Sequence, residues 1–188
     1  MKYRYIILTV SILTACVVFS GQAGSESSHS SNQAILSENI SQAVAVLHST
    51  QGNIVSGEVR FQTVEGGVRV TGKFSGLTPG KYGFHIHEKG DCSAPDGSSA
   101  GGHYNPLGKS HGEPDAIERH VGDLGNITAD KSGHALYDRV DSQLSLNGPY
   151  SIVGRSVIIH AGEDDLKSQP TGNAGARVAC GVIEIKAN

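Results

Sequence analysis

Short runs of alternating or β-branched residues, separated by glycine-bearing turns, constrain the fold of this chain more than any other feature of its sequence. Successive side chains of a strand point to opposite faces, so each run can bury one face and expose the other. Eight such runs predict an all-β fold, either an antiparallel sandwich or a barrel. The predicted strands cover residues 43–48, 54–61, 68–74, 82–87, 123–129, 135–140, 156–160 and 177–186.

The connections between these runs predict how the strands are joined. Residues 51–53 and 65–67 have the length and the glycines of hairpin turns, and residues 77–80 predict a third turn. We therefore expect the first four strands to form a meander, each beside the next. Two stretches, 88–122 and 161–176, are much longer, and loops of that length without secondary structure of their own are uncommon unless they are functional.

Residues 1–23 predict an export signal. Two basic residues precede an apolar run, 6–13, which is too short to span a bilayer but suits a secretory signal. The end of this run resembles the lipobox of bacterial lipoproteins, which would place a lipid anchor on Cys16. We favour this interpretation over ordinary cleavage after Ala23. The exported chain would then lie in the bacterial periplasm, tethered to a membrane as a lipoprotein.

The rest of the chain divides into a linker and one domain. Residues 17–40 are rich in Ser, Gly, Gln and Asn, which is typical of a flexible linker, and the domain is expected at 41–188. Two cysteines of this domain, Cys92 and Cys180, indicate a disulfide in an exported protein, with two free buried thiols as the alternative. Such a bond would contribute about 4.6 kcal/mol in the chain-entropy model.

The bulk charge and the histidine count point toward metals. A net charge of −3 at pH 7 argues against a nucleic-acid binder. Nine histidines are more than a chain of this size needs for folding, and imidazole is the commonest protein metal ligand near neutral pH. The spacing of the histidines must therefore decide the function.

Six histidines and one aspartate gather around the first long loop and two strand ends. His85 and His87 leave the same face of a predicted strand, although this pair alone is a weak signal. An all-imidazole set suits copper, and three imidazoles with one carboxylate complete a tetrahedron around zinc. Iron with two histidines and a carboxylate fits less well. The other members of the group are His103, His111, His120, Asp123 and His160.

Four segments resemble signature stretches of the copper/zinc superoxide dismutase family, and the resemblance extends from about 43 to 186. The intervals of 8 residues from His103 to His111, 9 to His120, 3 to Asp123 and 37 to His160 are those of eukaryotic-type members. The resemblance implies an exported bacterial member with a Greek-key, immunoglobulin-like fold. The segments are GFHIHEKGDC (83–92), AGGHYNPLGKSHG (100–112), ERHVGDLGNITAD (118–130) and TGNAGARVACGVI (171–183).

The resemblance implies two metal sites that share one ligand, with one copper and one zinc ion per subunit. Asp164 resembles a carboxylate that hydrogen-bonds a ligand of each metal, and an exposed acid beside Asp165 is the alternative. Cys92 and Cys180 match the family's intrachain disulfide. Copper would be bound by His85, His87, His103 and His160, and zinc by His103, His111, His120 and Asp123.

The implied activity is the conversion of two superoxide anions into dioxygen and hydrogen peroxide. Copper would change oxidation state, which redox-inert zinc cannot do, while His103 would carry a proton to the forming peroxide. Arg177 resembles the arginine that attracts superoxide, the alternative being a salt-bridged surface residue. Thr171 would line the channel. Lys167 is a candidate steering charge, because the 16 residues between His160 and Arg177 are fewer than eukaryotic members have.

Other functions on the same fold explain less of the sequence. A non-catalytic copper carrier would lose copper ligands or Arg177, and a copper-only dismutase would not need the three predicted zinc-specific ligands. A disulfide-stapled adhesion domain would not account for the histidine spacing. A homodimer is compatible with the resemblance, but the sequence indicates no interface. The histidines that match no ligand position are His29, His48 and His134.

Overall fold

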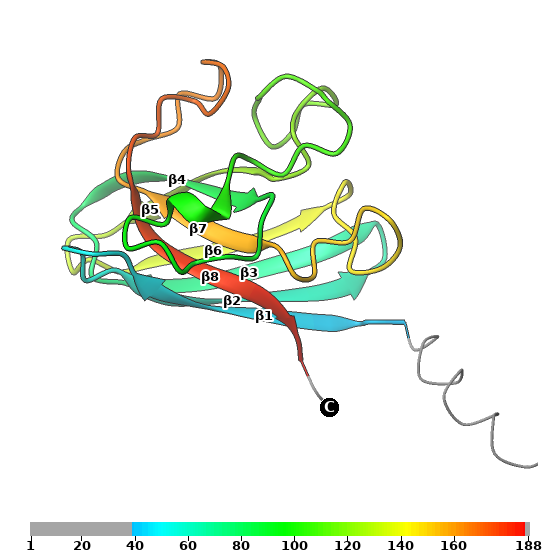
Figure 1. Ribbon diagram of the computed structural model, residues 1–188, viewed down its shortest axis with the longest axis horizontal. Helices are drawn as coiled ribbons and strands as arrows, with labels where there is room; N and C mark the ends of the chain where they lie inside the picture. Colours follow the sequence, from blue (N-terminus) through cyan, green and yellow to red (C-terminus); the bar gives the residue numbers. More distant parts are fainter. Residues whose placement is uncertain (1–38, 187–188) are drawn as a thin grey trace, which may run out of the picture. The chain divides into compact units, whose positions relative to one another are not determined.

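The computed structural model describes residues 39–186, which contain eight strands and one short 3-10 helix (Figure 1). The predicted export signal, Cys16 and nearly all of the predicted linker lie outside the described residues. In the described part, no helix is long and apolar enough to cross a membrane. The elements are β1 (Gln42–Ser49), β2 (Ser56–Val64), β3 (Gly67–Ser75), β4 (Gly80–His87), η2 (Ser98–Ala100), β5 (Asp123–Ala129), β6 (Ala135–Asp141), β7 (Ser156–His160) and β8 (Arg177–Ile185).

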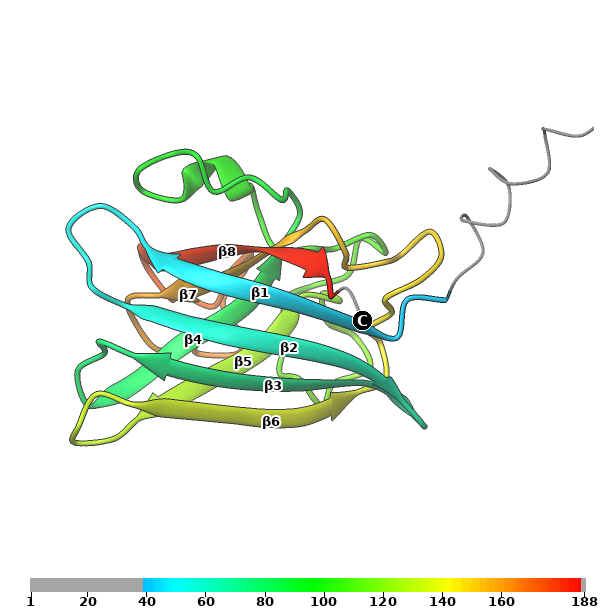
Figure 2. The same ribbon diagram turned by 90° about the horizontal axis from the view of Figure 1, so that it is seen from below.

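The eight strands close into a barrel in the order β1-β2-β3-β6-β5-β4-β7-β8, and β8 pairs back to β1. Every neighbouring pair is antiparallel. Figure 2 shows β1, β2, β3 and β6 side by side on one side of the barrel. The consecutive strands β4, β5 and β6, with β3 beside β6, form a Greek key. The prediction of an all-β, eight-stranded antiparallel fold is confirmed, in its barrel form.

The predicted meander of four strands is wrong after its third member. β3 pairs with β6, from Val68↔Asp141 to Phe74↔Ala135, whereas β4 lies between β5 and β7. Residues 76–79 therefore cross to another part of the barrel. Within this crossing Leu77 is buried, and its N–H donates to the carbonyl of Gly133 beside β6. Turn residues indicate that the chain reverses direction, but they do not specify which strand receives it.

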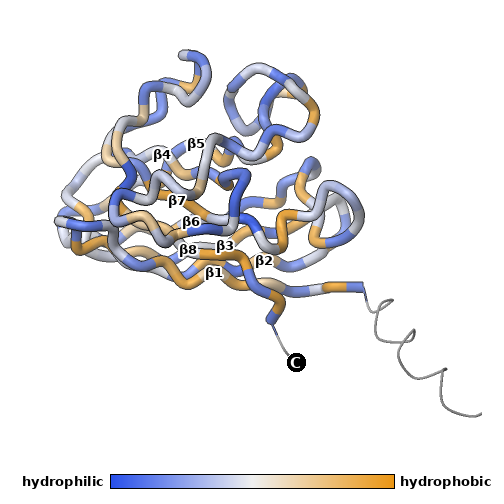
Figure 3. Tube along the Cα trace, in the orientation of Figure 1, coloured by the Kyte–Doolittle hydropathy of each residue, from blue (hydrophilic) through white to orange (hydrophobic). Residues whose placement is uncertain are grey.

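Alternation of inward and outward side chains builds the core of the barrel. In β3, Val68, Val70 and Phe74 are buried, whereas Arg69 and Lys73 are exposed. Figure 3 shows the resulting mixture of apolar and polar residues along the strands. The second strand begins two residues later than predicted, at Ser56, and Ile54 is left 80% exposed in the preceding loop. Local alternation thus predicts the strands well and their ends less well.

Strand β4 departs from the alternating pattern because both of its faces are covered. Phe84 and Ile86 belong to the hydrophobic core, while His85 and His87 point to the other face, and all four residues are fully buried. Beyond the last pair of β4 and β5, His85↔Asp123, the backbone of His87 forms an isolated bridge with His103 of the first long loop. A buried polar face of this kind is where a functional site is expected.

The predicted disulfide is present. Cys92 in the first long loop is bonded to Cys180 in β8, with 5.8 Å between their Cα atoms. The bond therefore ties residues 92–102 of the loop to the end of the barrel that carries His160 and Arg177, which are paired across β7 and β8.

Candidate metal centre

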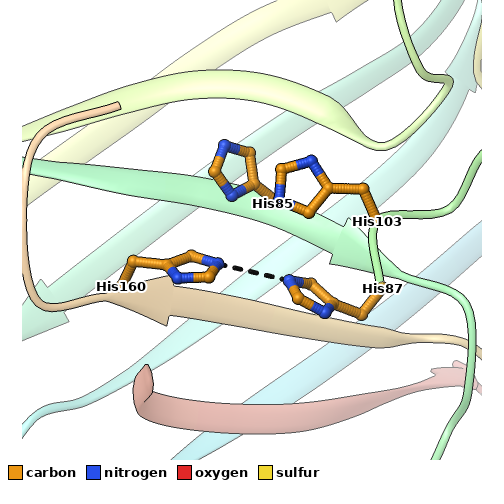
Figure 4. Close-up of side chains that lie close together, drawn as sticks. All are labelled: His85, His87, His103 and His160. Atoms are coloured by element: carbon orange, nitrogen blue, oxygen red, sulfur yellow. Dashed lines mark hydrogen bonds between the residues drawn. The ribbon is translucent and has the colours of Figure 1, made fainter. Parts of the chain in front are cut away.

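Four histidines from three parts of the chain converge on the covered face of β4 (Figure 4). His85 and His87 come from β4, His160 ends the neighbouring strand β7, and His103 belongs to the first long loop. The Nε2 atoms of His87 and His160 face each other at 3.3 Å, and the rings of His85 and His103 are 4.0 Å apart. One ligand atom from each of the four lies within 4.8 Å of the others. This group is made entirely of imidazoles.

A second group lies beside the first and shares one member with it. His103, His111, His120 and Asp123 also offer one ligand atom each within 4.8 Å of one another. Oδ1 of Asp123 lies 2.8 Å from Nδ1 of His103, 3.0 Å from Nδ1 of His111 and 3.2 Å from Nδ1 of His120. The single ring of His103 therefore takes part in both groups.

Two buried ring nitrogens show that the groups are suited to metal ions. Nδ1 of His85 and Nε2 of His103 are buried and have no hydrogen-bond partner among the described residues. A buried polar atom without a partner is unfavourable by about 1–3 kcal/mol, and a bound cation would provide the missing partner. The all-imidazole group fits copper, and the group of three imidazoles and one carboxylate fits zinc.

The electrostatics of the first group favour the neutral imidazoles that bind metals. Burial lowers the pKa of His85 to about 3, although its contact with Asp164 acts in the opposite direction. Burial also lowers the pKa of His160 to about 4 and the pKa of His87 well below its ordinary value. At neutral pH these three rings are therefore uncharged, with nitrogen lone pairs available to a cation.

The second group contains an anion. Burial acts to raise the pKa of Asp123, but its close contacts with His103, His111 and His120 outweigh it and lower the pKa far below its ordinary value. Burial acts to lower the pKa of His111, but its contacts with Asp123 and Asp164 raise it to about 9. A cation that binds here would displace the proton from His111, since metal ligands must be deprotonated.

Asp164, in the second long loop, lies between the two groups. Its Oδ2 is 2.8 Å from Nε2 of His85, and its Oδ1 is 2.9 Å from Nε2 of His111. Its backbone is held in turn by Asn126 of β5, which accepts from the Asp164 N–H at 2.8 Å and donates to the Asp164 carbonyl at 2.9 Å. The carboxylate is only 1% exposed, so the sequence-based alternative of an exposed acid is wrong.

Arg177 begins β8, opposite His160. Its Nη1 donates to the carbonyl of Gly97 at 2.5 Å, and its Nη2 donates to the carbonyl of Gly101, which also lies 2.9 Å from Nδ1 of His87. The disulfide-tied segment 92–102 thus supplies the oxygens that orient the guanidinium. Both terminal nitrogens of Arg177 therefore donate to carbonyl oxygens, whereas the alternative considered from the sequence was a salt-bridged surface arginine.

The remaining predicted site residues belong to neither of the two groups. In the second long loop, Thr171 is half-buried and Lys167 is exposed, and neither side chain has a hydrogen bond to a metal-group histidine within residues 39–186. His48 on β1 and His134 between β5 and β6 are exposed and belong to neither group. His29 lies outside the described residues.

One supporting residue was not predicted from the sequence. Arg119 is 2% exposed, and its Nη1 donates to the carbonyls of His120, Val121 and Asp123 at 2.9, 3.2 and 3.3 Å. Its Nη2 donates to both carboxylate oxygens of Asp141, at 2.7 and 2.6 Å. The only sequence signal is an arginine directly before a ligand histidine, because Asp141 is distant in the chain.

A second supporting contact was also not predicted from the sequence. Gln169 of the second long loop accepts a hydrogen bond from the N–H of His111 at 2.8 Å and donates to its carbonyl at 2.9 Å. The second long loop therefore holds the ring of His111 through Asp164 and its backbone through Gln169.

Comparisons with known proteins agree with this geometry. The profile of a family described as copper/zinc superoxide dismutase (SODC) matches residues 55–183. The extracellular superoxide dismutase [Cu-Zn] of Brugia pahangi is 48% identical over 155 residues, which are 77% of this chain and 76% of that protein. Among solved structures, the crystal structure of the clock protein EA4 is similar, with a TM-score of 0.72 and 47% identity over 79% of this chain and 97% of that chain.

Proposed function

The chain belongs to the copper/zinc superoxide dismutase family, and from this premise we propose how its residues divide the work of converting two superoxide anions into dioxygen and hydrogen peroxide. The observation that carries the function is the position of His103, whose one ring serves an all-imidazole group and a histidine–aspartate group. His85, His87, His103 and His160 would hold copper, which would supply one-electron redox chemistry. His103, His111, His120 and Asp123 would hold zinc, which would keep its charge and support the shared ring.

Arg177 is proposed to attract and orient superoxide. Its guanidinium carries a permanent positive charge and several fixed donors, which suits a small anion. Burial lowers its pKa from the ordinary value, but an arginine remains protonated in a protein. The carbonyl oxygens of Gly97 and Gly101 hold the guanidinium beside the histidines without neutralising its charge.

His103 is proposed to move the proton that the forming peroxide needs. Nδ1 of its ring faces Asp123 at 2.8 Å, on the zinc side, and Nε2 has no partner among the described residues. We place the transferable proton on Nε2, because this atom is the one free to exchange it with the substrate. Asp123 would keep the ring in place while Nε2 gains and loses the proton.

The second long loop is proposed to complete the site in two ways. Asp164 would fix the orientation of His85 and His111 by contacting one nitrogen of each ring, as outer carboxylates commonly do at metal sites. Thr171 would line the path to the histidines, and the exposed Lys167 would add positive charge near its entrance.

Replacement of His87 tests the assignment of the first group. His87→Ala should remove copper and abolish superoxide consumption while zinc remains, because His87 contacts no member of the second group other than the shared His103. Metal analysis and a superoxide-consumption assay measure both effects, with the exposed His134→Ala as the matched control. Full activity in the His87 variant would contradict the copper assignment. Retained copper without activity in the unmodified protein would indicate a carrier instead.

Replacement of Arg177 tests substrate attraction separately from metal binding. Arg177→Ala should slow superoxide consumption while both metals stay bound, and Arg177→Lys should restore part of the rate because it restores the charge. An unchanged rate in Arg177→Ala would argue against the proposed role.

Export is proposed from the disulfide and from the relative described as extracellular. The bacterial source, the periplasmic location, the lipid on Cys16 and a homodimer stay predictions, as does the division into leader (1–23), linker (17–40) and domain (41–188). The intact mass of the exported protein tests the leader: an acylated N-terminus at Cys16 supports the lipid anchor, and an N-terminus at Gly24 supports cleavage after Ala23. Size-exclusion chromatography with light scattering tests the dimer.

A further inference from the structure

Two segments of the chain have the sequence that accepts N-linked oligosaccharides. They are Asn39-Ile40-Ser41 and Asn126-Ile127-Thr128, each an asparagine followed two residues later by a hydroxyl residue. In a secreted protein this motif marks a glycosylation site only where the asparagine lies on the surface. Both segments match the motif, one with Ser and the other with Thr, so the structure must show which asparagine is accessible.

The side-chain amide of Asn126 already makes hydrogen bonds within the fold. It lies in β5, paired with Gly83 of β4, and is half-buried. Its Nδ2, the atom that would carry a sugar, donates to the carbonyl of Asp164 at 2.9 Å, and its Oδ1 accepts from the Asp164 N–H at 2.8 Å. A glycan would replace one of the two Nδ2 hydrogens and place a sugar against the carbonyl of Asp164, in the loop that places Asp164 between His85 and His111. A glycosylated Asn126 is therefore incompatible with the metal centre.

Asn39 differs from Asn126 in its exposure and its contacts. It is exposed, it precedes β1, and its side chain makes no hydrogen bond within the described residues. The residues after it are fixed: the N–H of Ile40 donates to Asn147 at 2.9 Å, and the carbonyl of Ser41 accepts from the N–H of Thr63 at 2.9 Å. The segment thus has a defined place at the start of β1. In Figure 1 this place is well separated from the two long loops that carry the metal-group residues.

We propose that Asn39 carries an N-linked oligosaccharide when the chain is secreted by a eukaryotic cell, and that Asn126 does not. The donor is a lipid-diphosphate-linked oligosaccharide of the secretory compartment. A bond forms between Nδ2 of Asn39 and the anomeric carbon of the first sugar, the bond from that carbon to the diphosphate oxygen breaks, and Nδ2 loses one proton as the lipid diphosphate leaves. The inference rests on the proposed export, but not on the dismutase activity.

The full chain, secreted from cultured eukaryotic cells with its own leader, provides the test. The secreted protein should carry one glycan, which peptide-N-glycosidase removes with the corresponding fall in mass. Asn39→Gln and Ser41→Ala should both lack the glycan. Thr128→Ala is the matched control, because it removes the second motif and leaves the Asn126 amide in place, and this variant should keep one glycan.

Several results would overturn the inference. These are a secreted, active protein without a glycan, a glycan that persists in Asn39→Gln, loss of the glycan in Thr128→Ala, or retention of the unglycosylated chain inside the cell. Superoxide consumption, measured on each secreted sample, separates this inference from the proposed function. Activity should be equal in the glycosylated protein and in Ser41→Ala, so an inactive but glycosylated protein would contradict the function alone.

Discussion

The charge of a buried side chain near the metal centre is balanced by its own set of hydrogen bonds and an oppositely charged partner, as Arg119 shows. Arg119 is the largest of the fully buried side chains, and its guanidinium contacts three carbonyls of the loop that carries His120 and Asp123, as well as the carboxylate of Asp141. A buried ion is stable only when opposite charge and hydrogen bonds replace the lost water. The Arg119–Asp141 pair therefore joins the zinc-binding segment to the end of β6.

Removal of one partner of this pair should destabilise the protein strongly. We expect Asp141→Ala to lower the free energy of unfolding by about 3–5 kcal/mol, because it leaves the charge of Arg119 buried and uncompensated. The control is Asp138→Ala, which breaks the ion pair between Asp138 and Arg69. The side chain of Asp138 is 54% exposed and that of Arg69 is 51% exposed. An exposed pair contributes only about 0–1 kcal/mol. Urea unfolding measures both, and similar losses in the two variants would contradict the role of burial.

Gly172 offers a second test at the scale of one residue. Its φ of +66° favours glycine, and an added Cβ would collide with the carboxylate of Asp164. Gly148 has a φ of +76° with nothing within 4 Å of an added Cβ, so Gly148→Ala has similar backbone strain without the collision. We expect Gly172→Ala, but not Gly148→Ala, to weaken metal binding by about tenfold or more in competition with a chelator, since it displaces an outer contact of His85 and His111. Equal affinities would contradict this role of Asp164.

At the scale of elements, the disulfide couples a loop to a strand. It joins Cys92 to Cys180 of β8, and the segment it holds carries the two carbonyls, of Gly97 and Gly101, that contact Arg177. One covalent bond therefore contributes both to the stability of the barrel and to the orientation of the residue proposed to attract superoxide.

Loss of the disulfide should have two separate effects. The double variant Cys92→Ala, Cys180→Ala should be less stable by up to about 4.6 kcal/mol, the chain-entropy value for its loop. It should also consume superoxide more slowly with both metals bound, because segment 92–102 no longer holds Gly97 and Gly101 in place. Thermal unfolding, metal analysis and the activity assay measure these effects. An unchanged rate in the folded variant would show that Arg177 is oriented without the disulfide.

For the whole molecule, the closed barrel and the metals stabilise one another. The barrel leaves no sheet edge unpaired, and β4 and β7 bring His85, His87 and His160 together only when both strands are in register. The unfolded chain has no such group, so copper and zinc bind the folded state preferentially, and binding free energy adds to the free energy of unfolding.

Metal removal should therefore lower the melting temperature without changing the fold. At free metal concentrations about 1,000 times the dissociation constant, each site contributes about 4 kcal/mol, which chelation would remove. Calorimetry of the chelated and reloaded protein measures the shift, and far-ultraviolet circular dichroism checks that the strands persist. A melting temperature that is the same with and without metals would contradict the proposed coupling.

Much of this molecule can be predicted from its amino-acid sequence, because the relevant signals are local. Alternation within single runs predicts the eight strands, and the motifs around His85, His103 and His120 predict the ligands of both metals through their family resemblance. The two cysteines left in the domain predict the disulfide, since an exported protein meets an oxidising environment. None of these inferences requires knowledge of which strands are neighbours.

The features that escaped the sequence all depend on contacts between distant segments. β3 pairs with β6 rather than β4, because the neighbour of β3 is determined by closure of the whole barrel. The residues of the turn after β3 do not indicate which strand that neighbour is. Arg119 meets Asp141 across 22 positions, and Gln169 meets the backbone of His111 across 58. The two glycosylation motifs are likewise distinguished by the contacts that the fold makes with each asparagine. Hydrogen bonds and burial at such separations arise when the chain closes on itself, so no local pattern can encode them.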